Sequence, residues 1–319
     1  MITLFNSARN LYRCENITAV WDAYKGSKIF KRGGYVDLIK QDSDRYDIVI
    51  TDEFVRNKDP HQKIIMIAHG LTGGKLYGID QPQGQFTPEC CKLVDYYITS
   101  SEYGRKFAAS AAGIPIDQCL PLGMPRTDKY INKHKGDGNT ILSRYKRSYL
   151  YLPTFRARYN QPSPKIDYEY LNSLLEEDEV FVVKRHIIRK NKMLPKTLTN
   201  ICEVDNNDPT YPYLFDCDVV ITDFSSAVFD AYLLDKPSVL VADENDDYLT
   251  SRGMYMRYPY EYSSRAISVE GNEDKFVELL RDAAHYGMTD VEYECREKTA
   301  SACDGHSTER VIELVKSLL

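Results

Sequence analysis

The chain has 319 residues, of which 43% are hydrophobic and 28% charged, and its formal net charge is -6. This composition is typical of a soluble globular protein with enough apolar side chains for two cores, and the acidic balance argues against a general nucleic-acid binder. No apolar run approaches the roughly 20 residues that cross a bilayer, and residues 1–10 lack the apolar centre of a signal peptide, so we expect a cytoplasmic protein.

The first 32 residues are locally basic although the whole chain is acidic. They contain six basic residues against Glu15 and Asp22, namely Arg9, Arg13, Lys25, Lys28, Lys31 and Arg32. A basic face can rest on anionic lipid, which would place the protein at the inner face of the cell membrane. A solvated charged surface is the commoner reason for such a cluster, so peripheral membrane contact is the weaker interpretation.

Three segments share a pattern in which an Asp precedes a short apolar run that ends in Thr followed by Asp or Ser. They are residues 47–52, 95–100 and 218–223. Each is typical of a strand whose carboxyl end brings polar side chains to the edge where open α/β sheets bind ligands. Further strands are predicted at residues 64–68, 149–152, 180–183 and 238–241, with room for helices between them.

This alternation predicts parallel α/β layers in two lobes that face one another across a cleft. The polar, Gly-containing stretch at residues 133–140 places the boundary after residue 140, giving an N-terminal lobe of residues 1–140 and a C-terminal lobe of residues 141–319. Residues 307–319 are amphipathic, and we expect them to form the closing helix of the second lobe.

Candidate chemistry in the first lobe begins at His69 and Gly70, which follow the predicted strand at 64–68. An imidazole with a pKa near ~6.5 accepts a proton from a hydroxyl nucleophile at cellular pH. A lone His at a strand end is more often structural, so the assignment depends on its neighbours. The turn at residues 123–128 presents Arg126 toward the region between the lobes.

In the second lobe, Arg156 follows the strand at 149–152, where a guanidinium favours phosphate, although a surface ion pair is an equal alternative. The strand at 180–183 runs into a basic turn with His186 and Arg189, whose charges would neutralise a departing phosphate unless the turn is only a solvated face.

The most informative stretch is residues 217–230, a buried strand, a tight polar turn and a helix. Thr222, Asp223, Ser225 and Ser226 surround a helix start whose dipole favours an anion, which predicts a phosphate site. Helix capping by Asp223 or Ser225 is the alternative, but two adjacent serines exceed what a cap requires.

No cofactor and no metal are expected, because the eight cysteines lack a CxxC pair and no acidic cluster has metal-ligand spacing. Charge neutralisation would then fall to side chains and helix dipoles.

With these residues in view, the chain resembles the CDP-glycerol glycerophosphotransferase family, which contains the teichoic acid primases and polymerases. The matching pieces occur in family order from residue 64 onward: His69-Gly70, Leu122 to Asp128, Pro153 to Arg156, His186, Ile221 to Ser226, Arg252 to Tyr255, and Asp304-Gly305 followed by Glu309-Arg310-Val311.

The resemblance implies a GT-B fold with two Rossmann-like lobes, in which the C-terminal lobe holds a CDP-linked donor and a glycerol phosphate unit passes to a hydroxyl with release of CMP. It implies that His69 is the general base, that His186 contacts the donor phosphates, and that Arg156, Ser225 and Ser226 contact the donor. We group Gly70, Lys75, Arg126 and Arg252 as acceptor or interlobe residues.

Two departures from the family pattern bear on the substrates. Residues 71–75 read Leu-Thr-Gly-Gly-Lys where the family has a Thr-Pro-type turn and a Lys, and Ile187 stands where a Pro usually follows the second His. The donor is therefore CDP-glycerol or CDP-ribitol, and the acceptor is a glycan or a lipid-linked molecule. A single-transfer or capsule-type enzyme is expected over a polymerase. The alternatives are a nucleotide-sugar glycosyltransferase or epimerase of GT-B architecture, and a catalytically silent sugar-phosphate binding module.

Overall fold

The computed structural model describes residues 2–6, 15–26, 28–32, 47–68, 70–82, 86–154, 156, 164–186, 194–195, 197–241 and 246–319. These residues form two compact units, each described by itself. Unit 1 comprises residues 1–131, 252–255 and 297–319, and unit 2 comprises residues 132–251 and 256–296.

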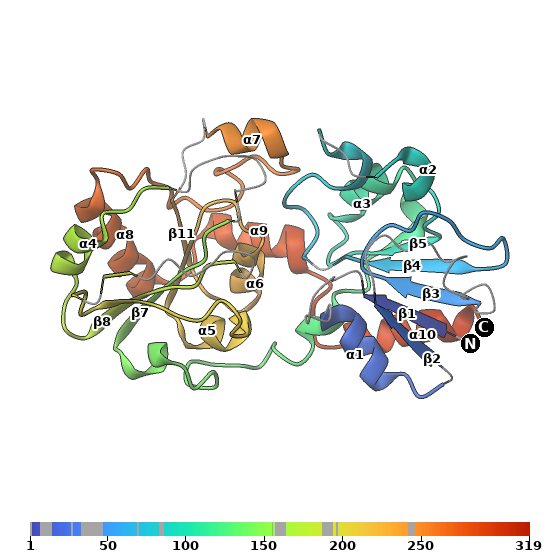
Figure 1. Ribbon diagram of the computed structural model, residues 1–319, viewed down its shortest axis with the longest axis horizontal. Coiled ribbons are helices and arrows are strands. Elements are labelled where there is room, and N and C mark those ends of the chain that lie inside the picture. The colour runs from blue at the N-terminus through green and yellow to red at the C-terminus, as the bar shows by residue number, and fades with distance from the viewer. Residues whose placement is uncertain are drawn as a thin grey trace. The chain divides into compact units, whose positions relative to one another are not determined.

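Unit 1 contains a six-stranded sheet in the order β2-β1-β3-β4-β5-β6 (Figure 1). Its strands are β1 (Ile2–Asn6), β2 (Lys28–Arg32), β3 (Ile48–Thr51), β4 (Lys63–Ile67), β5 (Tyr96–Ile98) and β6 (Cys119–Leu120). Its helices are α1 (Glu15–Ala23), α2 (Pro88–Cys91), α3 (Arg105–Ala112) and α10 (Ser307–Ser317), with short 3-10 turns η2 (Gly78–Asp80), η3 (Ile116–Gln118) and η4 (Pro125–Thr127).

Unit 2 contains a five-stranded sheet in the order β11-β10-β7-β8-β9. Its strands are β7 (Arg147–Tyr151), β8 (Glu179–Val183), β9 (Ile201–Glu203), β10 (Val219–Thr222) and β11 (Ser238–Leu240). The 3-10 turn η5 (Ile141–Arg144) precedes β7, and the helices are α4 (Tyr168–Leu174), α5 (Thr210–Asp216), α6 (Ala227–Leu233), α7 (Asp247–Arg252), α8 (Glu273–Tyr286) and α9 (Asp290–Ala300), the last of which runs into unit 1.

Every strand pair in both sheets is parallel. All seven strands expected from the sequence are present, each within one or two residues of the expected bounds. Parallel strands covered on both faces are apolar throughout, and β3, β10 and β11 are buried along their whole length.

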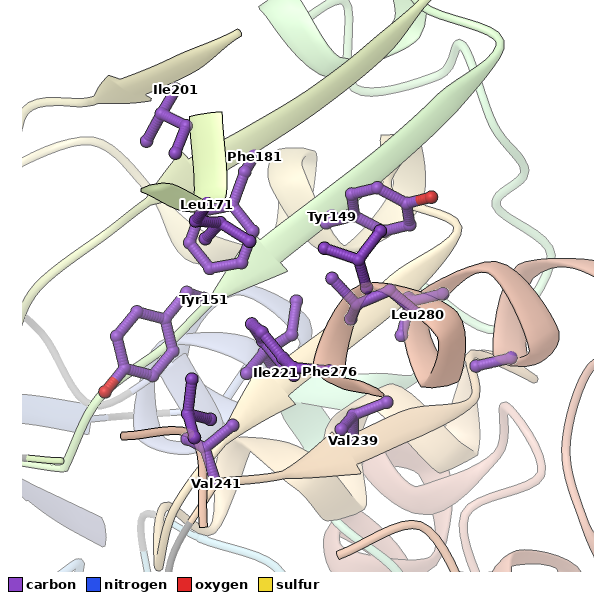
Figure 2. Close-up of a cluster of buried hydrophobic side chains, with 14 of the residues drawn as sticks. Tyr149, Tyr151, Leu171, Phe181, Ile201, Ile221, Val239, Val241, Phe276 and Leu280 are labelled. Carbon is purple, nitrogen blue, oxygen red and sulfur yellow. The ribbon is translucent and has the colours of Figure 1, made fainter. Parts of the chain in front are cut away.

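The core of unit 2 lies between its sheet and helices α4 and α8. Figure 2 shows Tyr149 and Tyr151 of β7, Phe181 of β8 and Phe276 of α8 within this cluster. The rings of Phe181 and Phe276 meet edge to face with centroids 6.2 Å apart. This packing holds β7 rigid, so the loop that leaves its carboxyl end starts from a fixed point.

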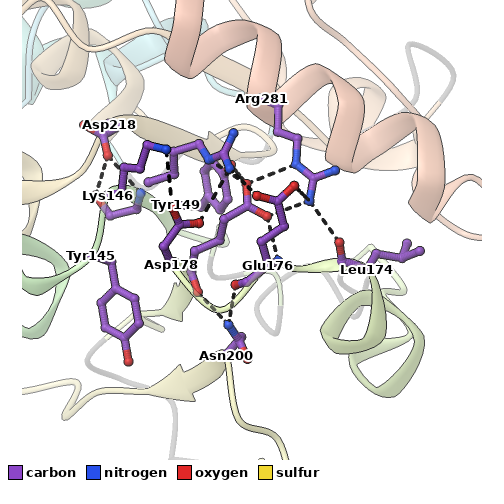
Figure 3. Close-up of polar contacts among 12 residues, drawn as sticks. Tyr145, Lys146, Tyr149, Leu174, Glu176, Asp178, Asn200, Asp218 and Arg281 are labelled. Carbon is purple, nitrogen blue, oxygen red and sulfur yellow. Dashed lines mark hydrogen bonds and ion pairs between the residues drawn. The ribbon is translucent and has the colours of Figure 1, made fainter.

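A buried polar network closes the opposite, amino-terminal end of β7 and β8 (Figure 3). The carboxylate of Glu179 is fully buried and accepts hydrogen bonds from Arg281 Nη2 at 2.7 Å, from the Tyr149 hydroxyl at 2.7 Å and from the Glu176 N–H at 2.9 Å. Burial by itself raises the pKa of Glu179, but these hydrogen bonds outweigh it, and the pKa lies below its usual value.

The division of the chain differs from the expected one in two respects. The first unit ends at residue 131, nine residues before the expected boundary, because Gly136, Gly138 and Thr140 donate backbone hydrogen bonds to Asp216 of unit 2. The amphipathic C-terminal helix was expected to close the second lobe, but α10 belongs to unit 1, where Val311 and Val315 are buried. Among the helices within the described ranges, none combines the length and the apolar character needed to cross a membrane.

Candidate functional site

In the unit 2 sheet, the order in which successive strands are added reverses between β7 and β10. The chain proceeds outward from β7 to β8 and β9 and then returns to add β10 and β11 on the other side of β7. In open parallel sheets, ligands bind outside the carboxyl ends of the strands at such a switch point. The loops after β10, β7 and β8 all leave the sheet at this edge, and they carry most of the donor-binding residues expected from the sequence.

After β10, the turn that leads to α6 divides its polar residues into buried and accessible ones. Thr222 and Asp223 are buried, and the Thr222 hydroxyl donates to the Leu152 carbonyl at 2.6 Å. Ser225 and Ser226 are only half-buried. Ser225 Oγ accepts from the Ala227 N–H at 3.3 Å, so Ser225 also caps the start of α6. Helix α6 has only seven residues, so its dipole is weak. The hydroxyls of Ser225 and Ser226 would therefore contribute more to the binding of an anionic ligand than the helix dipole.

A buried ion pair ties this turn to the loop after β7, and we call it the Arg156–Asp223 latch. Asp223 Oδ1 accepts from the Thr154 N–H at 2.7 Å, and Oδ2 pairs with Arg156 Nε at 2.8 Å. Arg156 Nη1 pairs in turn with Asp246 Oδ2 at 2.7 Å. The exposed fraction is 1% for both Arg156 and Asp223, so the latch is shielded from solvent.

Two aromatic rings complete the surroundings of the latch. The rings of Phe224 and Tyr248 stack at 5.0 Å, and the Arg156 guanidinium carbon lies 4.9 Å from the first ring and 5.4 Å from the second. Burial lowers the pKa of Arg156, but the two carboxylates outweigh burial and raise it, so the guanidinium stays charged.

This geometry favours a positioning role for Thr222, Asp223 and Arg156 over direct contact with a donor, because the Thr222 hydroxyl, both Asp223 oxygens and the Nε and Nη1 atoms of Arg156 bind protein groups. It leaves Ser225 and Ser226 as the side chains of the turn that can reach a ligand. The sequence-based role of Arg156 as a donor contact stays a prediction.

The loop after β8 places three basic residues in different surroundings. Lys184 is buried with Nζ 3.2 Å from the Asn206 carbonyl oxygen, and burial lowers its pKa. Arg185 Nε pairs with Glu203 at 3.0 Å, while His186 is exposed. His186 is therefore the most exposed of these three side chains, as a donor contact requires. Arg189 lies outside the described residues.

In unit 1, His69 lies outside the described residues, but both sides of it are described. Ala68 directly follows β4, and the loop from Gly70 is tied to the loop after β5. The Thr72 N–H donates to Ser100 Oγ at 2.8 Å, and the Ser100 N–H donates to Thr72 Oγ1 at 3.4 Å.

Residues 252–255 pair with residues 74–76 within the same unit. The Leu76 N–H donates to the Gly253 carbonyl at 3.1 Å, the Tyr255 N–H donates to the Gly74 carbonyl at 2.8 Å, and the Arg252 guanidinium donates to the Leu76 carbonyl. Tyr255 is anchored by its hydroxyl, which donates to Asp80 at 2.7 Å. The segments that carry Lys75 and Arg252, which the sequence groups as acceptor or interlobe residues, thus lie side by side.

The turn at residues 122–128 is fixed by the C-terminal segment. Asp128 accepts from the Thr308 N–H at 2.7 Å, and Arg310 Nε donates to the Leu122 carbonyl at 2.9 Å. Arg310 also pairs with Asp304 at 2.8 Å, and its hydrogen bonds lower the pKa of that carboxyl group to about 2. The motif residues Asp304 and Arg310 therefore hold a turn, and the side chain of Arg126 is buried within it at 7% exposure.

Several residues of these sites carry no signal in the sequence. Asp246 and Tyr248 complete the latch, and Asn16 joins two loops of unit 1. Each acts across a long sequence separation, which a local pattern does not reveal. Within the described residues, no group of three or more His, Cys, Asp or Glu side chains is placed to hold a metal ion.

The sequence profile of the CDP-glycerol:poly(glycerophosphate) glycerophosphotransferase family matches residues 25–317. The chain belongs to this family, as its motifs predict.

Among curated proteins, the chain is 26% identical over 288 residues to the teichoic acid glycerol-phosphate primase of Bacillus subtilis (strain 168), covering 85% of this chain and 74% of the primase. It is 26% identical over 298 residues to the teichoic acid poly(ribitol-phosphate) polymerase of Bacillus spizizenii, covering 85% of this chain and 45% of the polymerase. The chain thus spans about half the length of the polymerases that it matches.

Among solved structures, the wall teichoic acid polymerase TagF superposes with a TM-score of 0.75 at 18% identity, over 100% of this chain and 89% of that chain. At this identity the likeness concerns the fold, and it confirms the predicted GT-B-like α/β class.

Proposed function

We propose that this protein transfers a polyol phosphate unit from a CDP-linked donor to a hydroxyl group of a teichoic-acid-type or other cell-surface glycan acceptor, with release of CMP. The observation that carries the proposal is the turn after β10, where Ser225 and Ser226 are accessible at the switch point of the sheet while a buried latch fixes the backbone around them. Membership of the family supplies the reaction class.

In the proposed reaction, the acceptor oxygen attacks the β-phosphorus of the donor. A new P–O bond forms to the acceptor, the bond from the β-phosphorus to the bridging oxygen breaks, and CMP leaves with that bond's electron pair. His69 takes the proton of the acceptor hydroxyl, which contributes typically ~10² to 10⁴-fold to the rate.

Unit 2 would supply the donor contacts. The hydroxyls of Ser225 and Ser226 donate to phosphate oxygens, and His186 at the end of β8 neutralises charge that develops on the leaving CMP. Preorganised donors of this kind act best when they need no rearrangement during the reaction. The latch favours such preorganisation because both carboxylate oxygens of Asp223 and the Nε and Nη1 atoms of Arg156 are already paired with protein groups.

The donor alcohol and the acceptor are open to experiment, because relatives named for glycerol phosphate and for ribitol phosphate both match this chain. Purified protein should be incubated with acceptor and with CDP-glycerol, CDP-ribitol or a UDP-sugar in parallel, and the released nucleotide measured. We expect CMP from one or both CDP-linked donors and no UDP. Release of UDP instead would identify a glycosyltransferase or epimerase, and nucleotide binding without turnover would identify a silent binding module.

A variant separates catalysis from binding. His69→Ala should lower the rate of CMP release by about 10² to 10⁴-fold while the Kd for the CDP-linked donor stays within about twofold, because the base acts on the acceptor. The matched control is His61→Ala, since His61 is exposed and contacts only Asp59 among the described groups. CMP release at the wild-type rate in His69→Ala would remove the base from the proposed mechanism.

A further inference from the structure

Asn16 is a fully buried polar residue in a part of the chain that the family profile does not reach. It is the second residue of α1, its exposed fraction is 0%, and the profile begins at residue 25. A buried side-chain amide is costly unless its donor and acceptor atoms are both paired. The partners of Asn16 therefore indicate what it does.

The amide of Asn16 joins two loops that the sequence assigns to the acceptor half of the site. Its Nδ2 donates to the Ala68 carbonyl oxygen at 2.8 Å, and its Oδ1 accepts from the Arg126 N–H at 2.9 Å. Its Nδ2 also lies 3.7 Å from the Met124 sulfur. One side chain thus fixes a backbone acceptor at the end of β4 and a backbone donor in the turn at residues 122–128.

The bond to Ala68 bears directly on the proposed base. The carbonyl of Ala68 and the N–H of His69 belong to one peptide unit, and a peptide unit is planar. Holding the Ala68 oxygen therefore constrains the chain at the residue directly before the proposed base. The bond to Arg126 fixes the start of η4 relative to the same point.

Helix α1 is itself held in place by packing and a hydrogen bond, so Asn16 can hold both loops in fixed positions. Ile17 and Val20 of α1 are fully buried in the core of unit 1. Glu15 accepts a hydrogen bond from the Tyr130 hydroxyl at 2.9 Å, which ties the helix to the chain that follows the turn.

We propose that Asn16 is a positioning residue of the transfer reaction, which holds the Ala68 carbonyl, directly before the proposed base in the sequence, in register with the Arg126 turn. The proposal rests on the proposed function for its effect on catalysis, but its structural part can be tested without turnover. Misplacing a reacting group by about 1 Å can cost about 10²-fold in rate.

Two substitutions distinguish the hydrogen bond donated by Asn16 Nδ2 from the one accepted by Asn16 Oδ1. Asn16→Leu keeps the branched side-chain skeleton and removes both hydrogen bonds, whereas Asn16→Asp keeps an acceptor for the Arg126 N–H and removes the donor to Ala68. The matched control is Val20→Ala, which destabilises the same helix by creating a cavity at a fully buried side chain that forms no hydrogen bond. We expect both Asn16 variants to lower kcat per folded molecule by about 10- to 100-fold with the donor KM within about twofold, while Val20→Ala keeps kcat.

Amide hydrogen exchange provides a readout that does not depend on activity. The Arg126 N–H should exchange at least about 10-fold faster in Asn16→Leu and stay protected in Asn16→Asp and Val20→Ala. Unchanged protection of Arg126 in Asn16→Leu, or an equal loss of kcat in Val20→Ala, would overturn the proposal. If the wild-type protein releases no CMP from any CDP-linked donor, the proposed function fails, and the exchange rates still decide whether Asn16 holds the turn.

Discussion

Removing the carboxylate of Asp223 is expected to destabilise unit 2 substantially. In Asp223→Asn, the amide oxygen can keep the hydrogen bond from Thr154, but the amide nitrogen then faces the guanidinium of Arg156, which has an exposed fraction of 1%. Breaking a buried ion pair costs about 3–5 kcal/mol. Because Asp246 still pairs with Arg156, we expect the lower end, about 3 kcal/mol.

The assay is denaturant and thermal unfolding of the folded protein near pH 7. For a domain of roughly 150–250 residues, each kcal/mol shifts Tm by about 2–4 °C, so a loss of about 3 kcal/mol lowers Tm by about 6–12 °C. The double variant Arg156→Met with Asp223→Asn should be less destabilised than the sum of the single variants, with a coupling of about 1–3 kcal/mol. Such coupling is the signature of a pair whose charges depend on one another.

The competing possibility is that Arg156 and Asp223 act on the donor directly. In that case, Asp223→Asn would unfold like the wild-type protein, and its Kd for a CDP-linked donor would rise by more than about tenfold. That combination of results would refute the latch as a structural element. Arg156→Lys gives an independent check, since a lysine keeps the charge but cannot bridge both carboxylates, and it should also lose stability.

Other consequences follow from the two units. Because the pKa of Glu179 is lowered in the folded protein, its ionised form stabilises unit 2 above about pH 4.5, and this contribution is lost as the pH falls through the folded-state pKa. The difference in unfolding free energy between wild type and Glu179→Gln should therefore shrink below pH 4.5 in urea titrations. A difference that stays constant with pH would contradict the assignment. Gly253 has a φ of 71°, and a Cβ there would lie 2.3 Å from Leu76 Cδ1, so Gly253→Ala should cost about 1–3 kcal/mol and loosen residues 74–76 by hydrogen exchange. In that variant, adding Leu76→Ala removes the clash but not the backbone strain, so only partial recovery is expected. Ser226→Ala should weaken binding of a CDP-linked donor by about fivefold or more with little change in Tm. The reason is that Ser226 is half-buried and its side chain makes no capping hydrogen bond among the described residues. Unchanged donor affinity would remove this hydroxyl from the donor site.

The elements near the site are predictable from the sequence where local patterns are strong. The β-branched run Val219 to Thr222, followed by a Ser-Ser turn, specifies a buried strand and a helix start, and the structure has both. Four strands, β1, β2, β6 and β9, are not predicted; β6 and β9 are short and lack the flanking pattern that marks the equally short β5. Their pairing depends on neighbouring strands that are distant in the sequence.

What local patterns lack is information on long-range partners. Arg156 pairs with Asp223 and Asp246, which lie 67 and 90 residues away, so the sequence around Arg156 does not reveal its buried ion pairs. Asn16 reaches Arg126 across 110 residues, and nothing near it in the sequence marks it. The amphipathic pattern of α10 likewise specifies a buried face but not the unit that covers it.

A crystal structure of the protein with a bound CDP-linked polyol is the most direct test of the account. We expect the diphosphate at the turn between β10 and α6, with phosphate oxygens about 2.7–3.2 Å from the Ser225 or Ser226 hydroxyl and with the Arg156–Asp223 pair unbroken. A diphosphate bound away from this turn, or one held by Arg156 after the guanidinium has left Asp223, would contradict the account.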